Sequence, residues 1–410
     1  MEDPVERFQV YPQRFLVLFA VFCANFNNAI VWSTYAAVTP STAERYGVST
    51  WEINQLVLFF DMSFFPLCGV ALWVLDVKGL KPSVLTGVWI TICGAFLRWT
   101  AKYYYDPLEL ITVGSVMAAL VNPFTLDAPT KVAITWFAEN ERLTATTIMS
   151  LATYMGPAFV LTIAPLIVDG NPNNVDTLNW ITFLVILVLG IPSLLLQNEP
   201  PSPPSKVANQ SSVPFWDGVK QLTRNRQFIL LFWVAGISMG CFEVYITLIS
   251  DTVVPYGYSE TDAGTVGVIS ILSGILSSLV IARMLDHSKA HRIVLKILPF
   301  VTVVGAVGFF FSAHCADRRV FLYFSASIIG VGCFPVLPIA LEVGSECARP
   351  VAAGTSGGMI ETSIEFCAIF ILLVSNLLRQ EGDKLGYALV WFIGLWYLLR
   401  SHYFWVTPRS

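Results

Sequence analysis

Acidic residues stand inside long apolar stretches of this sequence, where a charge is costly. Four of them have mainly apolar surroundings: Asp61, Glu243, Glu342 and Glu365. A charged side chain at the centre of a bilayer costs about 2.5 to 3.5 kcal/mol on insertion scales, so each one requires a cavity, a partner or a function. A carboxyl group in a low-dielectric cavity binds a proton more readily than one in water, which makes these residues candidate proton-binding groups. For Asp61 and Glu342, structural pairing with a basic or amide group is the alternative.

Aromatic and amide side chains of the first apolar stretch could form a binding surface. Asn28, Trp32 and Tyr35 fall roughly along one stripe at helical spacing. Tyr154 and Tyr245 lie in later stretches. Aromatic faces beside carboxylates such as Glu243 and Glu365 attract an organic cation or a protonatable heterocycle through cation–π and Coulomb forces. We therefore expect a cationic or protonatable solute, while packing of the rings and interhelical hydrogen bonding by the asparagine are the alternatives.

The composition places these residues in a membrane rather than in a soluble domain. Of the 410 residues, 55% are hydrophobic and only 13% are charged, and the mean hydropathy is +0.66. Soluble domains carry about 25% charged residues. Lipid must therefore cover most of the surface. The first apolar stretch is too long for the core of a signal peptide, so we expect it to be a retained span.

Several functional classes find no support in the sequence. The net charge of −4 is small and scattered, which argues against a nucleic-acid partner. The eight cysteines occur singly and without metal-ligand spacing. Motifs for a catalytic nucleophile, a zinc protease or a phosphate-binding loop are missing, and the four histidines lie near predicted span ends. We expect no enzyme activity, no cofactor and no bound metal.

Apolar runs of about 20 residues predict membrane helices, because every backbone amide in lipid must be bonded within its own helix or barrel. Twelve runs of this kind are present: 15–37, 53–75, 82–101, 108–128, 144–168, 178–197, 227–250, 262–285, 293–313, 320–343, 354–378 and 385–406. With the N-terminus in the cytosol, the inner loops collect most of the Lys and Arg residues, as the positive-inside rule requires. The outer ends receive fewer: Arg45, Arg98, Lys102, Arg318, Arg319, Arg379 and Lys384. We predict an all-α integral membrane protein with both termini in the cytosol.

A polar, proline-rich segment separates the first six predicted spans from the last six. It reads QNEPPSPPSKVANQSSVPFWDGVKQLTRNR and has the composition of a linker. We predict an N-terminal six-helix bundle over 1–197, a cytosolic linker over 198–226 and a C-terminal six-helix bundle over 227–410.

Charged loop motifs recur in the two halves, as expected for repeats related by an axis along the membrane normal. LDVKGLK recurs as LDHSKAHR about 210 residues later, and ENERLTATT recurs as ECARPVAAGTSGG about 207 residues later. Carboxylates and basic groups at neighbouring helix ends can form charge-assisted hydrogen bonds that work as a gate. The candidate gating residues are Asp76, Lys78, Gly79, Lys81, Glu141, Arg142, Asp286, Arg292, Glu346 and Arg349. Alternatively, these charged residues only set the orientation of the helices in the membrane.

The LDVKGLK loop resembles the signature of the major facilitator superfamily, although Gly69 stands further from Asp76 than the usual spacing. A more detailed resemblance is to solute carrier family 49, which comprises the feline leukaemia virus subgroup C receptor-related proteins and the disrupted-in-renal-carcinoma branch. The motifs that carry it are YPQRFLVLF, IVWSTYAAV, WVLDVKGLK, ITWFAENERLTATTI, ATYMGPAFVLTIAPLIV and QNEPPSPPS, the last four being closer to the second branch. The resemblance is clear over 11–205 and patchier afterwards, where LPIALEVGSE and AGTSGGMIE carry it.

The resemblance implies two six-helix bundles and transport of a small organic solute by alternating access. It also implies that the first, fifth, seventh and eleventh helices line a central cavity, where Trp32, Tyr154, Tyr245 and Glu365 would face the solute. In the viral-receptor branch an aromatic residue at the position of Trp32 lines a cavity for choline-like substrates. Glutamines of that branch are replaced by Tyr154 and Glu365 here, and its seventh-helix tyrosine by Glu243. These departures favour a different, proton-coupled cargo such as vitamin B6, which the other branch is thought to carry.

Two alternatives to this cargo remain. Haem transport has been attributed to the family, but no histidine of this sequence lies in a span where it could ligate iron. A nutrient sensor or receptor on a transporter fold is the other alternative, and the short cytosolic tails favour transport. We expect a monomer in the plasma membrane or in an endolysosomal or vacuolar membrane. Its expected partners are a small-molecule substrate, the lipid bilayer and, as a candidate coupling ion, the proton.

Overall fold

The computed structural model describes residues 9–35, 38–202, 204, 213–253, 256–258, 260–288, 290–313 and 319–380. Within these residues, eleven helical stretches are long and apolar enough to cross a membrane. Each of them overlaps one of the first eleven predicted spans, so the all-α membrane architecture is confirmed. The predicted span over 385–406 lies outside the described residues.

The described helices pack as two compact units. The first unit contains the described residues up to Val219 together with Arg349–Gly358, and the second contains those of Lys220–Ala348 and those from Met359 onward. The predicted division into 1–197, 198–226 and 227–410 stays a prediction. The inclusion of Arg349–Gly358 in the first unit was not expected from the sequence.

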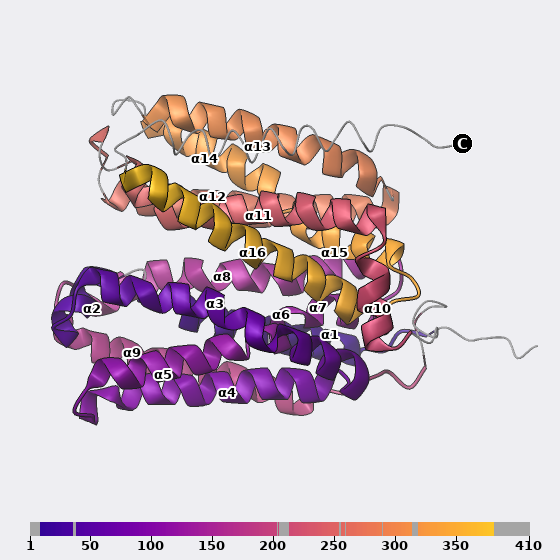
Figure 1. Ribbon diagram of the computed structural model, residues 1–410, viewed down its shortest axis with the longest axis horizontal. Helices are drawn as coiled ribbons and strands as arrows, with labels where there is room; N and C mark the ends of the chain where they lie inside the picture. The colour runs from indigo at the N-terminus through magenta and orange to yellow at the C-terminus, as the bar shows by residue number, and fades with distance from the viewer. Residues whose placement is uncertain are drawn as a thin grey trace, which may run out of the picture. The chain divides into compact units, whose positions relative to one another are not determined.

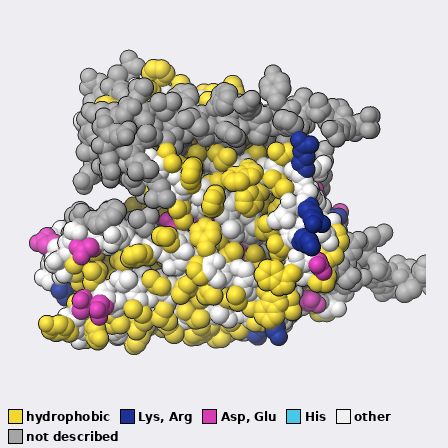
Figure 2. Space-filling model, in the orientation of Figure 1, with side chains coloured by type: hydrophobic (Ala, Val, Ile, Leu, Met, Phe, Trp, Pro, Cys, Tyr) yellow, Lys and Arg dark blue, Asp and Glu magenta, His cyan; other side chains and the backbone are white. Residues whose placement is uncertain are grey.

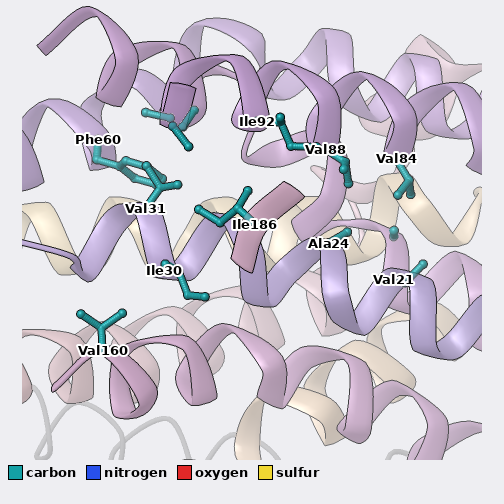
Figure 3. Close-up of a cluster of buried hydrophobic side chains, with 14 of the residues drawn as sticks. Val21, Ala24, Ile30, Val31, Phe60, Val84, Val88, Ile92, Val160 and Ile186 are labelled. Carbon is teal, nitrogen blue, oxygen red and sulfur yellow. The ribbon is translucent and has the colours of Figure 1, made fainter. Parts of the chain in front are cut away.

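The first unit is built around its first helix (Figure 1). Helix α1 (Gln13–Ser33) packs against seven other helices of the unit, α3 to α9. The helices of this unit are α1, α2 (Thr39–Tyr46), α3 (Thr50–Trp73), α4 (Leu80–Thr100), α5 (Pro107–Leu120), α6 (Pro123–Leu126), α7 (Ala128–Trp136), α8 (Arg142–Val168) and α9 (Val175–Gly190). Figure 3 shows part of the core around α1, where Ile30 and Val31 lie among side chains of α3, α4, α8 and α9.

The second unit is also built from helices. They are α11 (Arg226–Val253), α12 (Glu260–Ser288), α13 (His291–Ala313), α14 (Arg319–Cys333), α15 (Val336–Cys347) and the part of α16 (Ala353–Gln380) that follows Gly358. Gly236 and Gly240 of α11 lie against the backbone of α16, close to Ser363 and Ala368. Small residues at such crossings let two membrane helices approach closely. A short helix, α10 (Phe215–Leu222), precedes α11; its residues up to Val219 belong to the first unit and those from Lys220 to the second.

Local sequence signals explain where several elements begin and end. Ser49 and Glu52 form a reciprocal capping box at the start of α3. A π-helical turn, Val74–Lys78, continues α3 and ends at Gly79. Gly79 has φ +104°, a conformation that side-chain-bearing residues rarely adopt, and it separates this turn from α4.

The span over Pro107–Trp136 is broken into three pieces rather than continuous. Helix α5 ends at Leu120, and α6 and α7 begin with Pro123 and Ala128. Pro123 and Pro129 lack a backbone N–H, so neither can donate the hydrogen bond that would continue the preceding helix. The sequence predicted a single helix over 108–128, and the structure corrects this to a broken helix that runs eight residues further, to Trp136.

Apolar side chains cover most of the described surface in Figure 2, and charged side chains lie mostly toward the left and right edges of the view. Large apolar residues are exposed on both units, for example Leu166 at 72% and Leu276 at 65%. Such exposure would be unfavourable in water and is expected for helices that face lipid.

Candidate functional site

Trp32 of α1 and Asp61 of α3 form a hydrogen-bonded pair in the first unit. The indole Nε1–H of Trp32 donates to Asp61 Oδ1 over 3.1 Å. Both residues are half-buried, so neither is sealed within the helix bundle. The pair places an aromatic ring next to a carboxylate, which is the combination that attracts an organic cation. Of the residues predicted to bind substrate or proton, these two are joined by a direct bond.

Tyr35 lies in a buried polar network at the end of α1. Its hydroxyl donates to Asn179 Oδ1 of α9 over 2.9 Å and accepts from Nε of Arg98 over 3.2 Å. The guanidinium of Arg98 also lies 4.2 Å from the centre of the tyrosine ring, and its NH1 donates to the carbonyl of Val31 over 2.7 Å. These contacts fix the end of α1, and with it the helix segment that carries Trp32.

Arg98 is buried, with 4% of its surface exposed, although the sequence placed it among the outer-end charges. Among the described residues, no carboxylate lies within ion-pair distance of it. Helix α1 ends at Ser33, so the Val31 carbonyl is among the last four, which lack a partner within the helix. The negative end of the α1 dipole therefore takes the place of a counter-ion for Arg98.

Asn28 connects three helices of the first unit. Its Nδ2 donates to Thr91 Oγ1 of α4 over 3.3 Å and to the carbonyl of Ala118 on α5 over 3.0 Å. The residue is 3% exposed. These bonds correspond to the interhelical role that the sequence left open for it, and its contact with a solute stays a prediction.

The remaining predicted substrate and proton residues are distributed over both units. Tyr154 is half-buried on α8 of the first unit. In the second unit Glu243 and Glu365 are half-buried on α11 and α16, and Glu342 is buried on α15. Tyr245 is buried on α11, where its hydroxyl shares a hydrogen bond of 3.1 Å with Ser270 Oγ and its ring meets Phe309 edge to face.

Asp76 caps the start of α16, a contact made within the first unit. Its Oδ2 accepts from the backbone N–H of Thr355 over 2.7 Å and from the Thr355 hydroxyl. Lys131 Nζ lies 3.9 Å from the other oxygen, Oδ1. A carboxylate at a helix N-terminus satisfies free N–H groups and interacts favourably with the helix dipole. The predicted gating role of Asp76 thus has a defined partner, Thr355, which the sequence did not single out.

The other residues of the LDVKGLK loop shape the turn around Asp76. The backbone N–H of Lys81 donates to Asn198 Oδ1 over 2.8 Å. A Cβ on Gly79 would lie 2.8 Å from the same asparagine side chain, so this close approach requires glycine. Lys78 Nζ lies 5.6 Å from the ring centre of Trp73.

The second predicted gating motif gives a further ion pair. Glu141 pairs with Arg14 at 2.5 Å, and Arg142 is buried at the start of α8. In the second unit Asp286 is buried and Glu346 is exposed, whereas Arg349 is an exposed residue of the first. The side chain of Arg292 lies outside the described part of the chain.

Sequence reasoning missed Asp127, a buried acid in the broken span. It lies between α6 and α7 and has 2% of its surface exposed. The predicted span ended at 128, and Asp127 was not among the acids that the sequence singled out. The motif NPFTLDAPTK, with an acid between two prolines in an apolar run, was the available signal. Groups of three or more side chains suited to hold a metal do not occur among the described residues.

Comparisons with known proteins agree with this architecture. The model of the Major Facilitator Superfamily matches residues 17–371. Solute carrier family 49 member A3 of Danio rerio is 30% identical over 390 residues, which covers 92% of this chain and 81% of the relative. The choline/ethanolamine transporter FLVCR2 of Homo sapiens is 25% identical over 394 residues, covering 92% and 74% respectively.

A solved structure has a similar fold. The crystal structure of FucP, a major facilitator superfamily transporter in the outward conformation, gives a TM-score of 0.69 at 14% identity. The match covers 95% of this chain and 99% of that one.

Proposed function

Because the chain belongs to the major facilitator superfamily and, within it, to solute carrier family 49, we propose that it carries a small organic cation or protonatable amine by alternating access. Members of this family are multi-pass integral membrane transporters of small solutes and not enzymes. The main support for the proposed substrate class, an organic cation or protonatable amine, is the hydrogen-bonded pair of Trp32 and Asp61.

The chemistry of this pair favours a positively charged solute. The ring supplies a face that attracts a cation, worth about 0.5 to 2 kcal/mol. When ionised, the carboxylate supplies a full negative charge, and its hydrogen bond from the indole fixes its orientation. A solute with a protonated nitrogen can approach the ring face and the carboxylate at the same time. Relatives named choline/ethanolamine transporters carry solutes of this class, which supports the proposal.

Uptake by proteoliposomes tests the proposal. Radiolabelled ethanolamine, choline and pyridoxine are offered to the purified, reconstituted protein, with Trp32→Leu and Asp61→Asn as variants. Loss of a contact worth about 1 to 2 kcal/mol weakens apparent affinity about 5- to 30-fold, and we expect losses in this range. Trp32→Phe keeps an aromatic face and should lose less. Trp89→Leu, which changes a tryptophan that is 36% exposed on α4, is the matched control and should leave uptake unchanged.

The outcomes separate the remaining alternatives. Uptake that is the same in Asp61→Asn and Trp32→Leu as in the natural protein would contradict the proposal. Saturable binding of haem without flux of any amine would favour the haem reading, and binding of an amine without flux would favour a sensor.

Proton coupling by Glu243, Glu365, Asp61 or Glu342 is a separate part of the proposal. It is tested by uptake with and without an imposed pH gradient. We expect a rate that rises with the gradient and becomes indifferent to it in at least one of the four single carboxylate-to-amide variants. An uptake rate of the natural protein that does not depend on the pH gradient would contradict this part of the proposal.

A further inference from the structure

Asp127 is an acid that the proposed transport site does not use. It lies at the turn between α6 and α7, in the span that prolines break. Both oxygens of its carboxyl group are shielded, and neither accepts a hydrogen bond from any described residue. Buried carboxylates normally have hydrogen-bond donors or a counter-ion, because an ionised group without them is strongly destabilising.

The charged groups around Asp127 do not neutralise the negative charge of its ionised form. Asp76, in the π-helical turn that continues α3, lies under the same turn of α16 as Asp127, and its charge has the same sign. Lys131, one turn along α7, lies 3.9 Å from Asp76. Helix α8 packs against α7: Glu141, directly before α8, is paired with Arg14, and Arg142 is buried at the start of α8.

At the start of α16, two glycines lie against the two acids, Asp76 and Asp127. A Cβ on Gly354 would lie 2.5 Å from Asp76 Oδ1, and one on Gly358 would lie 2.8 Å from Asp127 Oδ2. These glycines are one helical turn apart and therefore share a face of α16. The segment Ala353–Gly358 contains no charged side chain. Asp76 accepts hydrogen bonds from Thr355 at the N-terminus of α16, whereas neither carboxyl oxygen of Asp127 accepts one from a described residue. The two acids beneath the same turn therefore have different environments.

We propose that Asp127 is a proton-binding site that couples protonation to the packing of residues 349–358 against the rest of the first unit. A proton added to one carboxylate oxygen gives the neutral acid, which can stay buried beside the ionised Asp76. When that proton leaves, two negative charges lie under one uncharged turn, and Asp127 can be hydrated only if the turn withdraws. Loss of the proton therefore releases residues 349–358.

This site is remote from the Trp32–Asp61 pair. Asp127 and Leu72 both lie against Gly358, and Leu72 is 11 residues (72 − 61) from Asp61 along α3, which is about 16 Å at 1.5 Å per residue. A proton on Asp127 thus acts on conformation and does not compete with a solute for the pair. The inference goes beyond the proposed function and does not depend on which solute is carried.

Hydrogen exchange of the backbone amides in 349–358 tests the proposal without any substrate. The full-length natural protein in detergent is measured by mass spectrometry between pH 5.5 and 8.5, with each rate divided by the intrinsic rate at that pH. We expect at least a tenfold fall in protection as pH rises. In Asp127→Asn, whose side chain stays neutral, we expect the low-pH protection at every pH.

Matched experiments keep the test decisive. Asp127→Ser is a second neutral variant if the asparagine variant does not fold, and Glu109→Gln, which changes an exposed acid in the first turn of α5, should keep the natural pH dependence. Protection that does not change with pH in the natural protein would overturn the proposal, and so would an unchanged profile in the neutral Asp127 variants. Replacing sodium by potassium should have no effect, and a profile that follows sodium instead of pH would also overturn it.

Discussion

Removal of the buried Arg98 guanidinium should destabilise the first unit. In Arg98→Met, a side chain of similar length keeps the packing but loses the charge and the donors. Three contacts disappear: a 2.7 Å charge-assisted bond to the Val31 carbonyl, a 3.2 Å bond to the Tyr35 hydroxyl and a cation–π contact at 4.2 Å. Val31 also keeps a buried carbonyl that has lost its partner.

These contacts give the magnitude. A hydrogen bond to a charged group contributes about 1.5 to 3 kcal/mol, the second bond about 1 kcal/mol and the cation–π contact about 1 to 2 kcal/mol. The desolvation of the guanidinium, which the variant avoids, offsets part of this sum. We expect a net loss of about 3 kcal/mol in the free energy of unfolding. At about 2 to 4 °C per kcal/mol for a unit of this size, the melting temperature should fall by about 6 to 12 °C.

Thermal unfolding of the detergent-solubilised protein measures this loss. Arg98→Lys keeps the charge at the α1 dipole but loses the planar fork, so it should show about half of the effect. Arg45→Met is the control, because Arg45 forms a part-exposed pair with Asp176 at 2.7 Å and such pairs contribute about 1 kcal/mol or less. The change in Arg98→Met combined with Tyr35→Phe should be smaller than the sum of the single changes. An unchanged melting temperature in Arg98→Met, or strict additivity with Tyr35→Phe, would refute the reasoning.

The remaining predictions concern the gating loops and the start of α3. Gly358→Ala places a Cβ against Leu72 Cδ2 and should lower the free energy of unfolding by about 1 to 3 kcal/mol, whereas Gly264→Ala, with nothing within 4 Å, should be neutral or stabilising. Equal effects of the two would contradict the close approach. Arg14→Glu and Glu141→Arg should each lower stability by about 1 kcal/mol, and the double exchange should restore it unless the 2.5 Å pair is absent in solution. The hydrogen bonds that Ser49 donates lower the pKa of Glu52. The contribution of Glu52 to the stability of the α3 start is therefore present above the ordinary carboxyl range and is lost as pH falls through the lowered pKa. Amide exchange at the start of α3 should therefore quicken in acid, relative to intrinsic rates, in the natural protein and not in Glu52→Gln.

The sequence predicted the candidate site unevenly. Trp32 and Asp61 were both singled out, because an aromatic and an acid in apolar runs are conspicuous, but their pairing across 29 positions of chain was not visible. Asp76 was recognised by its motif, while its partner Thr355 lies 279 positions away in an unremarkable run of small residues. Arg98 was read as an outer-end charge, because its burial depends on the α1 end and on Asn179, which local sequence does not reveal.

The amino-acid sequence alone determined the membrane environment, the helical class, the eleven described spans and the candidate acids. These properties follow from local composition, because insertion of a helix into lipid depends on its own apolar length and on its own hydrogen bonds. Only the tertiary structure decided which polar groups are buried, which of them are bonded and which are left without a partner. The placement of residues 349–358 over Asp76 and Asp127 is the clearest case. Burial and pairing are sums over residues distant in the chain, so no local pattern contains them.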